Sequence, residues 1–220
     1  MDGILFKDRE SAGRALADAY DGPREDVTVF GIARGGIPIA YPIAADVGGE
    51  LDVITARKLP VPWSPESGFG AIAPDGSMVL NPEMTPGLGL STQEIDRIGE
   101  QVLEEVRRRE RVYRGGGPPA QIEGKNVIIA DDGLATGYTM IASIQMVRKA
   151  KAKWVACAVP VSPADTAGRV SPMVDDFICL HVVRAYSFAV ASFYRDFHDM
   201  KDSEVLDILK EARERKATQD

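Results

Sequence analysis

Two adjacent carboxylates, Asp131 and Asp132, directly follow the apolar run 127–130 and precede a segment rich in small and hydroxyl residues, 133–139. An apolar run without alternation is typical of a strand buried on both faces of a parallel sheet, and ligands bind at the carboxyl ends of such strands. Ionised carboxylates only accept hydrogen bonds, so this acid pair suits a vicinal diol such as two ribose hydroxyls. The glycines, helix-initial amides and threonine hydroxyls that follow suit a phosphate monoester. A ribose 5-phosphate therefore fits both halves.

Other interpretations of the acid pair stay open. The two carboxylates could hold magnesium in a phosphatase-like or receiver-like domain, or they could form a turn that caps the next helix. The sequence argues against the magnesium phosphatase interpretation, because no nucleophilic Asp-x-Asp motif follows a predicted strand.

The run IIADDGLATGYT, residues 128–139, resembles the loop that binds phosphoribosyl diphosphate (PRPP) in the type I phosphoribosyltransferases. In that family two acidic residues hold the ribose hydroxyls and the turn after them holds the 5-phosphate. The resemblance implies a magnesium-dependent pentosyltransferase, which moves the 5-phosphoribosyl group of PRPP to a nitrogenous base and yields a nucleoside 5-monophosphate and diphosphate. The alternative from another class is a non-catalytic PRPP-binding regulator on the same fold.

The same resemblance assigns individual residues to this chemistry. Asp131 and Asp132 would be catalytic, would hold the ribose, and would contact Mg²⁺ mostly through ribose or water oxygens. Residues 135–139 would hold the 5-phosphate. The PRPP loop as a whole would include Gly133, Leu134, Ala135, Thr136, Gly137, Tyr138 and Thr139.

A second loop, Ala33-Arg34-Gly35-Gly36, lies between an apolar run and a predicted helix. Consecutive amides at such a position can converge on an anion, and the guanidinium of Arg34 adds positive charge. In the family this loop cups the diphosphate of PRPP, and by resemblance the peptide bond from Ala33 to Arg34 would be cis. The alternative is an ordinary glycine-rich turn.

Arg57 and Lys58 end the next predicted strand and precede a stretch rich in proline and glycine. Family members commonly carry a basic residue here, followed by a mobile loop. Two cations beside a leaving diphosphate would stabilise the charge that develops in the transition state. We therefore expect both residues to bind PRPP, with Lys58 and Arg34 acting in catalysis. A solvent-facing basic pair is the alternative.

One position of the PRPP loop narrows the choice of acceptor base. In the 6-oxopurine branch of the family, an Asp that faces the purine N7 stands before the Thr-Gly of the loop, whereas Ala135 stands there in this chain. The sequence therefore disfavours hypoxanthine and guanine, and favours acceptors of the adenine, orotate or uracil sort.

The aromatic segment 186–197 is the candidate base-binding side. Phe188 could stack on a flat ring and Asp196 could accept from ring N–H groups. The alternative is that four residues at helical spacing only seat the last helix on the core: Tyr186, Val190, Phe193 and Phe197.

Alternating strands and helices must position these residues. Apolar periodicity predicts helices at 9–20, at 37–45 and after the PRPP loop, and a short helix near 163–170. A capping box at Ser91 begins a long amphipathic helix. Strands are predicted at 27–32, 51–56, 127–130, 154–161 and 176–182, and a hairpin at 70–73 and 77–80.

The fold class is α/β. The resemblance implies the type I phosphoribosyltransferase fold, with a central parallel sheet of four or five strands flanked by helices, a small hood, and a mobile insert made of the hairpin and the long helix. We expect one domain over 1–220. Its predicted parts are a core at about 22–58 and 122–182, an insert at about 59–120, and a hood from 1–21 and 183–215.

Composition argues against other classes of partner. The 220 residues carry a net charge of −7, so no basic excess exists for binding nucleic acid. No apolar stretch reaches the roughly 18 residues that span a bilayer, so we expect no membrane partner and a cytoplasmic protein. Cys157 and Cys179 lie in apolar runs and are predicted to be core thiols.

The resemblance extends over nearly the whole chain. It is carried further by FGIARGGIPIA at 30–40 and FAVASFYRDF at 188–197, and it is closest to a poorly characterised group of predicted phosphoribosyltransferases. The family's habit suggests a homodimer.

Overall fold

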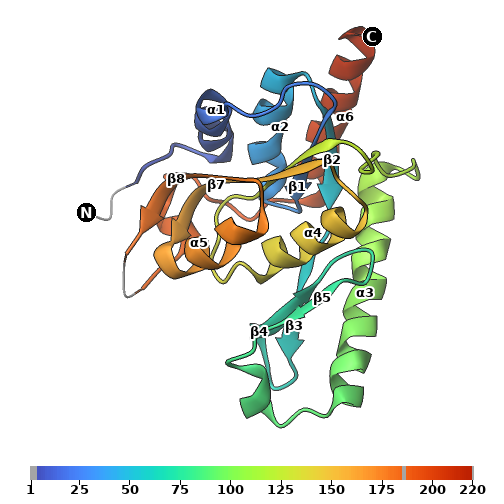
Figure 1. The fold of residues 1–220 in the computed structure, drawn as a ribbon, viewed down its shortest axis with the longest axis vertical. Helices are drawn as coiled ribbons and strands as arrows, with labels where there is room; N and C mark the ends of the chain where they lie inside the picture. The colour runs from blue at the N-terminus through green and yellow to red at the C-terminus, as the bar shows by residue number, and fades with distance from the viewer. Residues whose placement is uncertain (1–3, 185–186, 220) are drawn as a thin grey trace.

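The protein is built around a parallel sheet of five strands (Figure 1). The computed structural model describes residues 4–184 and 187–219. The strands lie in the spatial order β2-β1-β6-β7-β8, which confirms the predicted α/β class. Their bounds are β1 Val27–Ile32, β2 Glu50–Ile54, β6 Asn126–Ala130, β7 Trp154–Pro163 and β8 Asp176–Val183.

Helices cover both faces of this sheet, which is why its central strands are apolar throughout. Every residue of β1 and β6 is buried. Helices α1 Arg9–Ala19, α2 Gly36–Val47 and α6 Asp202–Gln219 pack on one face, and α4 Tyr138–Lys149 and α5 Ala164–Val170 on the other (Figure 1). Within the described ranges, no helix has the length and hydrophobicity needed to cross a membrane.

The two cysteines differ in their environment. Cys157 is fully buried between β6, β8 and the α4 face, as predicted for a core thiol. Cys179 on the outer strand β8 is only partly buried, because this strand has a sheet neighbour on one side alone.

An insert projects away from the central sheet between β2 and β6 (Figure 1). Its antiparallel sheet has the order β3-β4-β5 and packs on a long helix, with an apolar core of its own that includes Leu59, Phe69 and Val106. The elements are β3 Arg57–Val61, β4 Ser64–Ile72, β5 Met78–Leu80, the 3₁₀ helix η1 Thr85–Leu88, and α3 Thr92–Arg114.

The sequence predicted only two of these three strands. Strand β2 ends at Ile54 rather than Ala56, and a separate strand begins at Arg57 and pairs antiparallel with β4. Pro60 and Pro65 lie inside β3 and β4. Proline cannot donate to a ladder and argues against a strand, so the sequence pattern indicated a loop here.

Helix α3 begins at the predicted capping box. The amide of Glu94 donates to Ser91 Oγ at 3.3 Å, and the amide of Ser91 donates to Glu94 Oε2 at 2.9 Å. The helix ends where Gly115 takes the left-handed conformation, with φ of 61°.

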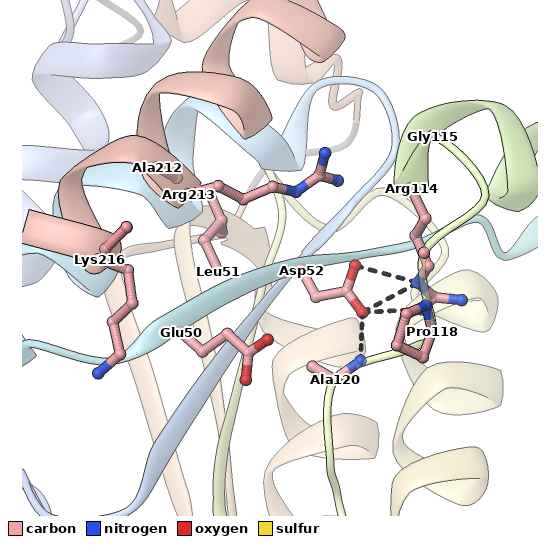
Figure 2. A pocket seen from close by; sticks show the side chains of 12 residues that line it. Glu50, Leu51, Asp52, Arg114, Gly115, Pro118, Ala120, Ala212, Arg213 and Lys216 are labelled. Carbon is pink, nitrogen blue, oxygen red and sulfur yellow. Dashed lines mark hydrogen bonds and ion pairs between the residues drawn. The ribbon is translucent and has the colours of Figure 1, made fainter. Parts of the chain in front are cut away.

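A buried ion pair fixes the carboxyl end of α3 to the core (Figure 2). Arg114 Nη2 lies 2.9 Å from Asp52 Oδ2, and both side chains are only about one-tenth exposed. Asp52 also accepts from the amide of Ala120 at 2.9 Å, and Arg114 Nη1 lies 3.0 Å from Glu110. Asp52, Arg114 and Ala120 border a pocket of about 520 Å³. It lies at the amino end of β2, the opposite end of the parallel sheet from the acid pair.

The described part of the chain between β8 and α6, from residue 187 onward, is extended rather than α-helical. Residues 187–201 contain only the short 3₁₀ helix η3 Val190–Phe193, and α6 begins at Asp202. The helical spacing is therefore wrong for residues 187–197, and the backbone of residues 193–196 hydrogen-bonds to residues 5–7 instead. Phe193 is nevertheless buried in the core, and Tyr186 lies outside the described residues.

Both segments that were assigned to a hood contribute to the main core. Residues of α1 and α6 pack with α2 in one apolar cluster. The division into core, insert and hood remains a prediction.

Candidate functional site

The two predicted loops lie side by side at the carboxyl edge of the sheet. Strands β1 and β6 are neighbours, so the loop 33–36 after β1 faces the acid pair after β6. The close approach of the two loops requires glycine at positions 35 and 36. A Cβ on Gly35 would overlap the carboxylate of Asp132, and a Cβ on Gly36 would lie 2.5 Å from the carbonyl oxygen of Ala130.

Arg34 lies at the exposed side of this loop. The peptide bond from Ala33 to Arg34 is cis, as the resemblance implied. The Arg34 guanidinium is 39% exposed and lies 3.6 Å from Asp202 at the start of α6. Asp202 in turn accepts a 2.7 Å hydrogen bond from Tyr113 of α3. Arg34 is therefore open to an anion and linked through one carboxylate to the insert helix.

Arg9 is a site residue that the sequence did not reveal. Its Nε donates to Asp132 Oδ2 at 2.8 Å and its Nη1 donates to the carbonyl of His198 at 2.9 Å. The guanidinium lies 3.8 Å from the centroid of the Phe197 ring, and the side chain is 9% exposed. These contacts are distant in sequence, so no local spacing marks them. The one available signal was a cation in the first turn of a helix, where the macrodipole disfavours it.

Burial raises the pKa of both carboxyl groups of the acid pair. For Asp131 the charge of Asp132 adds to the effect of burial, and the pKa stands well above the usual 3.8. For Asp132 burial also raises the pKa, and Arg9 offsets part of the rise. A cation or hydroxyl donors placed beside the two carboxylates would stabilise their ionised form. Among the residues described, no group of three acidic, histidine or cysteine side chains could hold a metal.

The loop after the acid pair presents the start of α4. Gly137 is the N-cap residue, with φ of 77°, and within the described chain no side chain caps the helix. The first amides of α4 therefore have no partner inside the helix. Side chains of α5 fix the loop from its other side: Thr166 Oγ1 donates to the carbonyl of Ala135 at 2.8 Å, and Arg169 Nη1 donates to the carbonyl of Thr136 at 3.1 Å. The amides of the helix start remain for an anion.

Arg57 and Lys58 are not brought to the same place. They are neighbours in strand β3, so their side chains leave opposite faces of the sheet. Arg57 Nη1 lies 3.5 Å from Glu105 of α3. Burial lowers the pKa of Arg57, and the charges of Arg109 and Arg34 lower it further, so Arg57 lies on the side of Arg34. Lys58 instead pairs with Glu66 of β4 at 3.9 Å. The role of Lys58 at the diphosphate stays a prediction, whereas Arg57 is the better placed of the two.

The candidate base-binding residues lie on the extended segment beside the PRPP-like loop. Phe188 is half-buried, with its ring centroid 5.3 Å from that of Phe193. This segment contacts the acid-pair loop directly, because Tyr194 donates its hydroxyl to the carbonyl of Asp132 at 2.7 Å. Asp196 is two-thirds exposed and lies 3.3 Å from His198 Nδ1. Binding of a base by Phe188 and Asp196 remains a prediction.

Comparison with known proteins decides the family. The family model described as "Phosphoribosyl transferase domain" matches residues 73–197. The chain belongs to the phosphoribosyl transferase domain family. The matched range includes both the acid pair and the segment 188–197.

Two relatives of this phosphoribosyl transferase domain share most of its length. A Mycobacterium tuberculosis protein with a provisional phosphoribosyl transferase name is 39% identical over 94% of this chain, which spans only 47% of that relative. The crystal structure of TT1426 from Thermus thermophilus is 33% identical, with a TM-score of 0.78, and the match covers 94% of this chain and 99% of that one. The fold is therefore that of type I phosphoribosyltransferases, as predicted.

Proposed function

We propose that this protein transfers the 5-phosphoribosyl group of PRPP to a nitrogenous base, which yields a nucleoside 5-monophosphate and diphosphate. One observation carries the proposal: an acid pair, an uncapped helix start and a glycine-arginine loop adjoin at the carboxyl edge of one parallel sheet. Their chemistries match the ribose diol, the 5-phosphate and the diphosphate of PRPP, respectively.

In this scheme each group acts on a different part of PRPP. Asp131 and Asp132 accept hydrogen bonds from the ribose hydroxyls, and residues 135–139 hold the 5-phosphate through amides and hydroxyls. Arg34 and Arg57 stabilise the negative charge that develops on diphosphate as the bond from ribose C1 to oxygen breaks. The sugar then has oxocarbenium character, and a ring nitrogen of the base captures it.

The acid pair also fits the magnesium that the family uses with PRPP. Magnesium prefers one or two carboxylates and completes its shell with waters and substrate oxygens. Burial raises the pKa of both Asp131 and Asp132, and Arg9 offsets only part of this rise, so a bound cation would favour the ionised form of the pair. Bound magnesium would supply positive charge to the leaving diphosphate, and Asp131 and Asp132 would hold it directly or through water.

A panel of bases with PRPP and magnesium, scored for release of diphosphate, tests the proposed function. We expect release with at least one base. Tight binding of PRPP without release with any base would instead indicate a PRPP-binding regulator, and absence of PRPP binding would overturn both functions.

Within that panel, we expect hypoxanthine and guanine to be poor acceptors because Ala135 replaces the purine-facing carboxylate.

Replacement of Phe188 by alanine should raise the apparent Michaelis constant for the true base, since stacking is worth about 1 to 3 kcal/mol per face. PRPP binding should stay nearly unchanged. The control is Trp63→Ala, which removes a large exposed aromatic ring from the insert. Loss of PRPP and base binding together in Phe188→Ala would show that the base pocket is misplaced.

We expect Arg9→Met to weaken PRPP binding, and to do so most strongly at mildly acidic pH. Arg9 opposes the rise in the pKa of Asp132, so its loss raises that pKa further. A ribose-binding carboxylate must be ionised. As the pH falls, the variant should therefore lose PRPP binding at a higher pH than the wild type does. Titration calorimetry of PRPP over a pH series measures this shift. Arg14→Met, on the exposed side of the same helix, should follow the wild-type profile, and an unshifted profile for Arg9→Met would contradict the role of Arg9.

The homodimer and the cytoplasmic location remain predictions. Light scattering on the purified protein measures the first of them.

A further inference from the structure

A group of arginines surrounds one carboxylate on the insert helix. Glu105 Oε1 lies 2.7 Å from Arg109 Nε and 3.5 Å from Arg57 Nη1, and Glu105 Oε2 lies 2.7 Å from Arg108 Nε. We call these four residues the Glu105 cluster. It joins β3 to α3, and it sets three positive charges against one negative charge in a protein whose net charge is −7.

Helix packing alone does not account for this excess of positive charge. Pairs at spacings of three and four residues, such as Glu105 with Arg108 and Arg109, are common on helices and need only one cation. The third arginine comes from another element. Burial and the charges of Arg109 and Arg34 lower the pKa of Arg57 in spite of Glu105, which means that the guanidinium groups repel one another.

The cluster is open to a ligand. The side chains of Arg57, Arg108 and Arg109 are 43%, 59% and 28% exposed. Hydrogen bonds from Arg108 and Arg109 lower the pKa of Glu105 to about 2, so this carboxylate stays ionised at any ordinary pH. The other charged groups nearby are Arg34 and Asp202, which face the cluster from the loop 33–36 and from α6.

We propose that Arg57, Arg108 and Arg109 form a binding site for a phosphate-type anion, adjacent to the loop 33–36, in which the insert helix supplies two of the three cations. Guanidinium groups bind phosphate oxygens through paired N–H donors, so three partly exposed guanidinium groups that meet at one carboxylate match the chemistry of a phosphate. The phosphate has two sources: the outer phosphate of PRPP, or a separate phosphate-bearing molecule. The first source rests on the proposed function, and the second does not.

Calorimetric titration of inorganic diphosphate into the full chain, at fixed ionic strength, tests the site. We expect Arg108→Gln with Arg109→Gln to weaken diphosphate binding by about tenfold or more, since charge-assisted hydrogen bonds are among the strong ones. Glu105→Gln should act in the opposite direction and tighten binding, because it removes the one competing carboxylate. Arg97→Gln is the matched control: it removes the same charge from the same helix, about 18 Å away along the axis.

Ribose 5-phosphate and PRPP separate the possible outcomes. Ribose 5-phosphate should bind the double variant as it binds the wild type, which also shows that the variant is folded. A matching loss of PRPP affinity assigns the site to the outer phosphate of PRPP, and unchanged PRPP affinity assigns it to a separate ligand. Diphosphate binding that is absent from the wild type, or equal in the double variant and Arg97→Gln, would overturn the proposal. Binding of diphosphate but not of PRPP would leave the site standing and remove the proposed function.

Discussion

Replacing both Asp131 and Asp132 by asparagine is expected to weaken PRPP binding by several kcal/mol while the protein stays folded. Hydrogen bonds to charged groups are worth roughly 1.5 to 3 kcal/mol each, and the acid pair would provide at least two of them to the ribose hydroxyls. Asparagine keeps the shape of each side chain and an acceptor oxygen, so Arg9 would keep a partner. Titration calorimetry with magnesium and PRPP measures the loss. Unchanged affinity in a folded double variant would contradict the ribose assignment.

The same double variant has a second, independent signature. Both carboxyl groups have a pKa above 3.8 in the folded protein, so the folded state holds their protons more tightly than the unfolded state does. Their contribution to the free energy of unfolding therefore falls as the pH rises from 3.8 through the raised values. We expect the double variant to lack this pH-dependent loss, so its stability relative to the wild type should increase between acidic and neutral pH. Urea unfolding at acidic and neutral pH measures the difference.

The parts of the site that the sequence predicted are those made by single short segments. The acid pair and the loop 33–36 each follow a buried strand, and the carboxyl ends of adjacent parallel strands necessarily meet. Their side-by-side arrangement at Gly35 therefore followed from local pattern and from sheet topology.

The parts that the sequence did not predict depend on contacts between distant segments. Arg9 meets Asp132 only because α1 packs beside the sheet and the chain near His198 returns to it. Arg57 and Lys58 are adjacent in sequence, and only the unexpected strand β3 separates them onto opposite faces. The prolines of the insert concealed that strand, and with it the position of Arg57 beside Glu105.

Loss of the buried ion pair between Arg114 and Asp52 is expected to have the largest effect on stability. Arg114→Met should lower the free energy of unfolding by about 3 to 5 kcal/mol, because it leaves Asp52 buried without its cation. Asp52 is only 8% exposed on its side chain, and the amide of Ala120 would be a weak substitute for a guanidinium that binds it through two nitrogens.

Denaturant unfolding measures this loss, and Arg111→Met is its control. Arg111 is three residues earlier on α3 and exposed, so its replacement should change stability by no more than about 0.5 kcal/mol. Adding Asp52→Asn to Arg114→Met should restore part of the loss, since the uncompensated buried charge is then gone. Equal stabilities of Arg114→Met and Arg111→Met would mean that the ion pair does not hold α3 to β2. Helix α3 also carries Glu105, Arg108 and Arg109. If Arg114→Met loosens the attachment of α3 to the core, it should therefore also weaken diphosphate binding at these residues, although it does not contact them.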